Sequence, residues 1–184
     1  MERYVIDTSL FVNPQARKHF GKDPSSAVRS FVKKLEKLDI EIFIPPSVFN
    51  ELANFVDNST MDELDIVIKK RSPNTYGIYL PAAVFYDFID DVRTRVNKGM
   101  RLAEDFAKDN RADNDEKLKK LREKYRGAMR AGILDSVEDF ELVLLSKELD
   151  ATLISSDEGV LQFANQIGVE WLGADKFYHL MKKK

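Results

Sequence analysis

The stretch ILDSVEDFELVLLSKELDATLISSDEG, residues 133–159, combines a helix pattern, a strand pattern and three carboxylates that could point to one site, those of Asp135, Asp139 and Asp157. A helix starting near Ser136 would place Asp135 and Asp139 one turn apart on the same side. Apolar residues fill the segment to Leu149, and the β-branched run at 151–154 then predicts a buried parallel strand. Asp157 follows that strand at its carboxyl end, where open α/β sheets keep their ligand sites. The stretch therefore predicts an α/β fold with acidic side chains at one sheet edge.

The composition is that of one globular protein of ordinary size. The chain has 184 residues, of which 43% are apolar, and can bury its own core. Charged residues reach 33% but leave a net charge of -2, so any basic surface must come from local clustering. Cysteine is absent, which excludes disulfides and thiolate metal sites. Neither a membrane-spanning run nor a signal peptide is visible, and we expect a cytoplasmic protein without a membrane partner.

Outside the opening stretch, short strands alternate with amphipathic helices. Strands are predicted at 4–6, 40–44 and 169–172, and helices from Ser25, at 46–52, at 61–70 and at 160–167. Residues 76–80 are predicted to be extended, and residues 181–184 to fray. The alternation favours a central, mostly parallel sheet covered by helices.

Residues 81–132 do not show this alternation of short strands and helices. Apolar residues recur every three or four positions from Pro81 to about Lys108, which predicts one helix of roughly 39 Å. A polar stretch at 109–114 ends it, and a second helix is predicted from Asp115 to about Ala131. The chain thus divides into an α/β domain, 1–80 with 133–184, and an inserted helical hairpin, 81–132.

Four acidic residues occupy similar positions relative to the predicted strands. Asp7 and Asp157 follow strand ends, Glu51 lies about one turn beyond another, and Asp139 opens a helix; if the strands are parallel, these ends converge. Carboxylates held close together repel each other, and a hard divalent cation relieves the repulsion. We expect Mg²⁺ or Mn²⁺ held by Asp7, Asp139 and Asp157, a site suited to cutting phosphodiesters.

Each of these acids also has a simple structural explanation. Asp135 with Glu138, and Ser136 with Asp139, match the spacing of a capping box, and Glu51 could favour the positive end of its helix. The sequence shows no residue pattern typical of another kind of catalytic site. His19 and His179 match no metal or triad spacing and are interpreted as surface or packing residues, and nucleotide-binding glycine loops are absent.

The pattern resembles the PIN-domain nucleases. The resemblance rests on VIDTS at 5–9, on Glu51 after Ile44-Pro45-Pro46, on VEDFELV at 137–143 and on LISSDEG at 153–159. A closer likeness, which spans essentially the whole chain, is to the small RNA-free ribonuclease P proteins known as the HARP family, also called RNA ligase partner proteins. It implies a PIN-like three-layer fold with a protruding helical hairpin.

The resemblance also implies an activity. Members remove the 5' leader from precursor tRNA with Mg²⁺ and leave a 5'-phosphate. Matched by position, Asp7, Asp135, Asp139 and Asp157 correspond to the family's acidic site, and Glu51 to the acid common to PIN domains. The hairpin of relatives mediates dimers and higher oligomers and engages the tRNA elbow.

The residues of the hairpin suit these two roles. An apolar stripe that the partner helix covers incompletely would bury itself against a second subunit; its members are Phe85, Phe88, Val92 and Val96. The second helix carries a basic face that would bind RNA phosphates by charge; its members are Lys119, Lys120, Arg122, Lys124, Arg126 and Arg130. The alternative is a solvated face whose charge Asp115, Glu116 and Glu123 relieve.

Two other functions remain open. One is a toxin-type PIN endoribonuclease that cuts other RNAs, which the long insertion disfavours. The other is a noncatalytic scaffold for an RNA-processing enzyme, for which a full acidic quartet has no purpose. The sequence favours a metal-dependent endoribonuclease acting on precursor tRNA, in which Asp139→Asn abolishes cleavage and keeps the fold.

Overall fold

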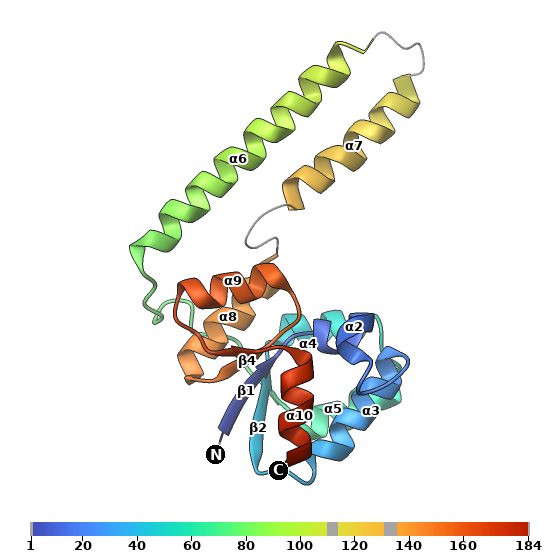
Figure 1. Cartoon of the computed structure of the whole chain (residues 1–184), viewed down its shortest axis with the longest axis vertical. Coiled ribbons are helices and arrows are strands. Elements are labelled where there is room, and N and C mark those ends of the chain that lie inside the picture. The colour runs from blue at the N-terminus through green and yellow to red at the C-terminus, as the bar shows by residue number, and fades with distance from the viewer. Residues whose placement is uncertain (1, 110–113, 131–135, 184) are drawn as a thin grey trace. The chain divides into compact units, whose positions relative to one another are not determined.

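In the described residues, five parallel strands form one sheet in the order β3-β2-β1-β4-β5. Figure 1 labels the central strands β2, β1 and β4. The structure is a computed structural model that describes residues 2–109, 114–130 and 136–183. It comprises two compact units, one formed by Met1–Tyr79 with Ser136–Lys184 and the other by Leu80–Asp135. The strands are β1 (Glu2–Ile6), β2 (Ile40–Ile44), β3 (Lys69–Lys70), β4 (Thr152–Ile154) and β5 (Trp171–Leu172). The fold class is α/β, as predicted.

Helices cover both faces of the sheet in the first unit, which corresponds to the predicted nuclease domain and is called the nuclease unit. α8 and α9 lie on one face, and α3, α5 and α10 on the other (Figure 1). This division follows from right-handed crossovers, because the chain moves from β1 toward β2 and β3 first and later toward β4 and β5. The helices of the unit are α1 (Ser9–Val12), α2 (Pro14–Arg17), α3 (Pro24–Leu35), α4 (Pro46–Leu52), α5 (Asn58–Val67), α8 (Val137–Leu149), α9 (Glu158–Gln166) and α10 (Ala174–Lys183).

The order of the strands creates a switch point between β1 and β4. Connections leave β1 in one direction across the sheet and reach β4 on its other side, so the loops after these two strands diverge. Such a point is where doubly wound sheets open a crevice at the carboxyl ends of their strands. Residues 7–9 and 155–157 therefore lie where a binding site is expected.

An aromatic cluster anchors the face that carries α3 and α10. Phe11, Phe31 and Phe177 are fully buried, and the ring centroids of Phe31 lie 5.2 Å from Phe11 and 6.3 Å from Phe177. Tyr4 of β1 continues the cluster, 5.1 Å from Phe177. Buried aromatic side chains contribute large apolar areas and prefer such tilted geometries. The cluster thus fixes both helices against the central strand.

Three local predictions were wrong. The helix predicted at 61–70 ends at Val67, and Lys69–Lys70 forms the edge strand β3 beside Phe43 and Ile44. Residues 75–77 form a turn where an extended segment was predicted. The predicted frayed tail is the last turn of α10 up to Lys183.

The second unit holds two long helices, α6 (Ala82–Ala107) and α7 (Asn114–Arg130). Gly99 allows their close approach, because a Cβ atom there would lie 2.6 Å from the Tyr125 ring. Arg95 Nη1 also donates to the Met129 carbonyl oxygen at 2.9 Å. The predicted helix end at Ala131 lies outside the described residues. None of the described helices combines the length and the apolar character that a membrane crossing requires.

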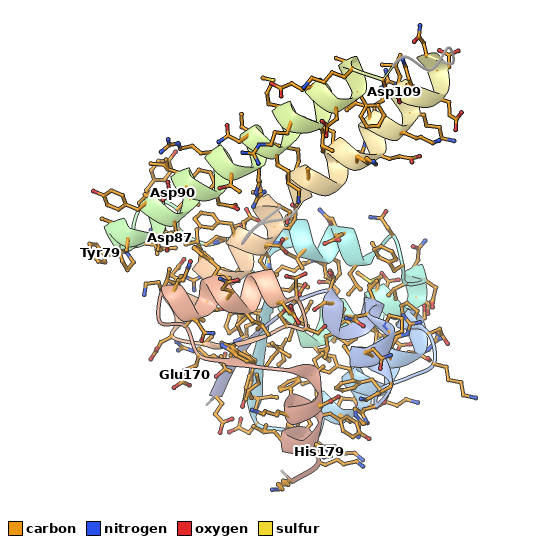
Figure 2. The ribbon with its side chains drawn as sticks, turned by 45° about the horizontal axis from the view of Figure 1, so that its top comes forward. Tyr79, Asp87, Asp90, Asp109, Glu170 and His179 are labelled. Atoms are coloured by element: carbon orange, nitrogen blue, oxygen red, sulfur yellow. The ribbon has the colours of Figure 1, made fainter. Side chains whose placement is uncertain are left out.

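One side of α6 stays apolar and uncovered within this unit. Phe85 is 56% exposed, Phe88 59% and Val96 51%, and Val92 lies on the same side. Figure 2 shows Asp87 and Asp90 between these positions on the helix. Contiguous exposed apolar side chains of this size mark an interaction surface more often than a solvated one.

Candidate active site

The pairing of β1 with β4 brings Asp7 next to Ser155. Ile6 is in register with Ile154, and the Asp7 N–H continues the ladder by donating to the Ile154 carbonyl oxygen at 3.0 Å. The next residue on each strand therefore faces the other, and Ser155 Oγ donates to Asp7 Oδ2 at 2.5 Å. Sheet register alone thus positions the first candidate side chain.

Hydrogen-bond donors surround the buried Asp7 carboxylate, which is only 5% exposed. Ser9 Oγ donates to Oδ2 at 2.5 Å, and the Ser9 N–H donates to Oδ1 at 3.2 Å. Thr8 Oγ1 donates to Oδ1 at 3.3 Å. Together with Ser155 these groups compensate the loss of hydration that a buried carboxylate suffers. Asp7 is therefore held rigidly at the switch point.

Glu51 is the acid whose electrostatics the site perturbs most clearly. Burial raises the pKa of its carboxyl, and the nearby charges of Asp7 and then Glu138 raise that pKa further, while a hydrogen bond from Thr8 opposes the shift. Carboxylates from the end of β1, from α4 and from α8 thus lie within electrostatic reach of one another. The convergence predicted for Asp7 and Glu51 is present.

Two local features fix α4 and α8 at this edge. Pro46 occupies the first turn of α4, as predicted, and Ser136 caps α8 by accepting from the Asp139 N–H at 3.1 Å. Ser47 of α4 donates a hydrogen bond to the Glu141 carboxylate of α8. The bond holds the N-terminal halves of the two helices together, and the half-buried Asp139 and Glu138 lie in the first turn of α8. Asp135 lies outside the described residues.

Asp157 serves as the N-cap of α9. Its Oδ1 accepts from the N–H groups of Gly159 at 2.8 Å and Val160 at 3.1 Å, and the side chain is exposed. The Asp157 N–H donates to Ser155 Oγ at 3.0 Å, which links its backbone to the Asp7 carboxylate. Helix capping, the structural role considered above for Asp135 and Ser136, therefore applies to Asp157. Its position at the carboxyl end of β4 is the one predicted.

The donors at this edge suit a hard divalent cation. They are oxygens of carboxylates and hydroxyls, the atoms that Mg²⁺ and Mn²⁺ prefer. Ser156 Oγ is buried there without a hydrogen-bond partner in the described part of the chain. Within the same residues no three acidic or histidine side chains are grouped closely enough to hold a metal ion. The ligand set Asp7, Asp139 and Asp157 stays a prediction.

Sequence reasoning missed three contributors. Glu138 was considered only as a capping partner, although it lies beside Asp139 in the first turn of α8. Ser9 and Ser155, whose hydroxyls hold Asp7, were not proposed as parts of the site. The segments VIDTS and LISSDEG each place a serine two residues from an aspartate, a symmetry that could have identified both hydroxyls.

The two histidines lie close together in the structure, although they are far apart in the sequence. The ring centroids of His19 and His179 lie 6.1 Å apart, and His19 Nε2 lies 3.1 Å from Asp175 Oδ1. His179 belongs to α10 (Figure 2), and the pair packs against Tyr178. Their packing role agrees with the interpretation made from the sequence.

A Glu51→Gln variant is expected to be thermally more stable than the wild type near pH 7 when a chelator is present. Because the pKa of Glu51 is raised on folding, its ionisation opposes folding once the pH exceeds the ordinary glutamate value, and the penalty is complete above the folded pKa. At acid pH, where glutamate is protonated in both states, the two melting temperatures should coincide.

Thermal unfolding followed by circular dichroism between pH 3 and pH 8 measures this difference. The exposed Glu36→Gln is the matched control and should show no such pH dependence. If the Glu51→Gln protein were less stable than the wild type at pH 7, the repulsion of Glu51 by Asp7 and Glu138 would be contradicted.

The chain matches known proteins over nearly its whole length. The family model described as PINc domain ribonuclease matches residues 3–184. A protein of Pyrococcus furiosus named RNA-free ribonuclease P is 43% identical over 98% of this chain and 93% of its own. Proteins of the same name in Thermococcus onnurineus and Thermodesulfovibrio yellowstonii are 44% and 42% identical, over 98% and 95% of this chain and 94% and 91% of their own. The chain therefore belongs to the PINc-domain ribonuclease family and, within it, to the group of the RNA-free ribonuclease P proteins.

Proposed function

We propose that this chain is an RNA-free ribonuclease P, an endoribonuclease that removes the 5' leader from precursor tRNA. The carrying observation is the convergence of Asp7, Glu51 and Glu138 at the switch point of a chain that shares more than 40% identity with proteins of that name. Water attacks the phosphorus at the leader junction and the bond to the leader's 3' oxygen breaks. The leader leaves with a 3'-hydroxyl, and the mature end keeps the 5'-phosphate.

The acidic residues have distinct proposed roles. Asp7, Asp139 and Asp157 would hold Mg²⁺ or Mn²⁺, which when bound supplies charge stabilisation at the phosphate and an acidified water. Glu51 is suited to accept the proton of the attacking water, because its raised pKa makes it the better base at this edge. Asp135 completes the proposed acidic set, and Ser9 and Ser155 orient Asp7.

Leader removal by the purified protein is expected with Mg²⁺ and is expected to cease with a chelator. Without the cation, the converging carboxylates repel the phosphate and no positive charge compensates the transition state. Precursor tRNA labelled at its 5' end, resolved on a sequencing gel, measures the rate and maps the cut.

The same gel separates the alternatives. A single cut at the leader junction supports ribonuclease P activity, whereas scattered cuts in unrelated RNAs would identify a toxin-type nuclease. Complete absence of cleavage with Mg²⁺ and with Mn²⁺ would favour the scaffold.

The hairpin unit is proposed to bind the body of the tRNA through α7. Lys119, Arg122 and Arg126 line a hollow of about 400 Å³, together with Leu118, Asp115 and Glu123. Lys120 pairs with Glu116 at 2.5 Å and Lys124 lies 5.5 Å from the Phe106 ring centroid, so these two are partly engaged within the unit. The side chain of Arg130 lies outside the described residues. Unpaired cations bind phosphates without reading sequence, as an enzyme for many tRNAs requires.

The apolar side of α6 is proposed to join copies of the chain into a homo-oligomer. Replacing Phe88 and Val92 with Asp is expected to convert the oligomer to smaller species at micromolar protein concentration, because charge cannot be buried unpaired at such an interface. Light scattering coupled to gel filtration measures the mass. Arg101→Asp, on the opposite side of α6, is the control and should leave the mass unchanged. An unchanged mass for the double variant would exclude this interface.

The cytoplasm is the proposed compartment. The absence of cysteine from the sequence fits a reducing environment, and precursor tRNA is processed where it is transcribed in cells without a nucleus.

A further inference from the structure

A hollow between α3 and α10 gathers basic side chains away from the hairpin. Its volume is about 750 Å³, and no acidic residue is among the described residues that line it. Both helices belong to the nuclease unit, and the hollow lies on the sheet face opposite α8 and α9 (Figure 1). Its lining residues are Ser26, Arg29, Ser30, Lys33, Lys34, Lys37, Leu38, Met181 and Lys182.

The charges of this hollow are poorly neutralised by the protein itself. Arg29 pairs with Asp57 at 3.6 Å. For Lys33, Lys37 and Lys182, no carboxylate of the described residues lies within ion-pair distance, and all three side chains are exposed. Glu36 and Asp39 flank the end of α3 without forming such a pair. Like charges four residues apart, as at 29, 33 and 37, repel each other along a helix. A bound polyanion would relieve that repulsion.

Tyr178 organises the rim of the hollow. The ammonium groups of Lys34 and Lys182 lie 5.1 Å and 4.9 Å from the centroid of its ring, and His19 stacks on the ring at 5.1 Å. Two lysines from different helices are thus held near one aromatic ring. Prior ordering of flexible cations lowers the entropy lost when they bind an anion.

The direction of α3 sets where the basic side chains lie along the strands. α3 runs from the end of β1 back to the start of β2, so Ser26 lies toward the carboxyl ends of the strands and Lys37 toward their amino ends. From Ser26 to Lys37 the helix rise covers about 16 Å. The basic residues Arg29, Lys33 and Lys37 therefore follow α3 toward the amino-end edge of the sheet.

We infer that the hollow between α3 and α10 is a second RNA-binding surface, which holds the sugar-phosphate backbone of the substrate along the face of the nuclease unit that carries these two helices. The inference rests on the proposed function for one point, which is that the bound RNA is the substrate of the enzyme. The contacts are ionic and read no base sequence. They are separate from those of α7, which belongs to the other unit.

The test compares two double variants of the full chain. Lys33→Ala with Lys37→Ala removes two charges from the hollow, and Lys22→Ala with Lys176→Ala removes two exposed charges that do not line it. Binding of labelled precursor tRNA is measured by fluorescence anisotropy in chelator, across a salt series. Because each phosphate contact contributes a salt slope of roughly 0.7 to 0.9, the hollow variant should bind about 30-fold more weakly near 0.1 M salt, with a slope lower by about 1.5.

Thermal stability distinguishes binding from folding effects. The hollow variant should melt at or slightly above the wild-type temperature, since relieving like-charge repulsion cannot destabilise α3. If it binds RNA with the affinity and salt slope of the control variant, the surface is excluded. If precursor cleavage fails in every protein while the hollow variant alone loses RNA binding, the inference stands and the proposed function falls.

Discussion

An Asp7→Asn variant is expected to lose leader removal by on the order of 10³-fold while keeping its fold. Asparagine has the shape of aspartate, and the hydroxyls of Ser9 and Ser155 can rotate to satisfy its amide, so the packing at the switch point is preserved. The negative charge is lost, and a loss of about 4 kcal/mol of transition-state stabilisation corresponds to that factor.

Single-turnover cleavage of precursor tRNA in Mg²⁺ measures the loss. The control is Asp39→Asn, an exposed aspartate just before β2 at the opposite edge of the sheet, which should cleave normally. Circular dichroism should show equal helix content for both variants. Near wild-type cleavage by Asp7→Asn would place the chemistry elsewhere in the chain.

A variant of α7 in which Lys119, Arg122 and Arg126 are replaced by Ala is expected to bind precursor tRNA about 100-fold more weakly near 0.1 M salt. Three phosphate contacts, each with a salt slope of roughly 0.7, account for this factor. The turnover rate at saturating substrate should change little, because these side chains belong to the hairpin unit, whereas Asp7, Glu51, Asp139 and Asp157 belong to the nuclease unit.

Fluorescence anisotropy over a salt series and steady-state kinetics provide the two measurements. The matched control replaces Lys22, Lys69 and Lys176, three exposed lysines of the nuclease unit, and should reduce affinity far less. Affinity that is insensitive to salt in the wild type would show that α7 does not act through charge.

The elements that could be predicted from sequence are those with a long or strongly apolar pattern. The buried strands β1, β2 and β4 and the helix α6 are confirmed close to their predicted bounds. The strand β3 was missed because Lys69 and Lys70 have no strand propensity and form a two-residue edge strand through pairing with β2. α10 was not predicted, although Phe177 and Met181 have helical spacing; both are buried, and Phe177 packs on Tyr4 and Phe31.

For the site, topology was predictable and detailed contacts were not. Asp7 and Glu51 converge because parallel strands share a carboxyl edge, a rule that needs no coordinates. The approach of Glu138 to Glu51 depends on how α8 packs beside α4, which the contact of Ser47 with Glu141 fixes and which no sequence spacing encodes. Similarly, the basic hollow joins α3 to α10, two helices more than a hundred residues apart in the chain.

The hydrogen bond between Ser155 and Asp7 joins positions separated by 148 residues. A ribosome synthesises the first of them long before the second, so a growing polypeptide lacks the neighbouring strand that fixes its first aspartate. Such distant pairing slows folding relative to local contacts. It also means that a partly synthesised chain has no assembled centre with which to cut the RNAs around it, and cleavage competence begins only with the completed molecule.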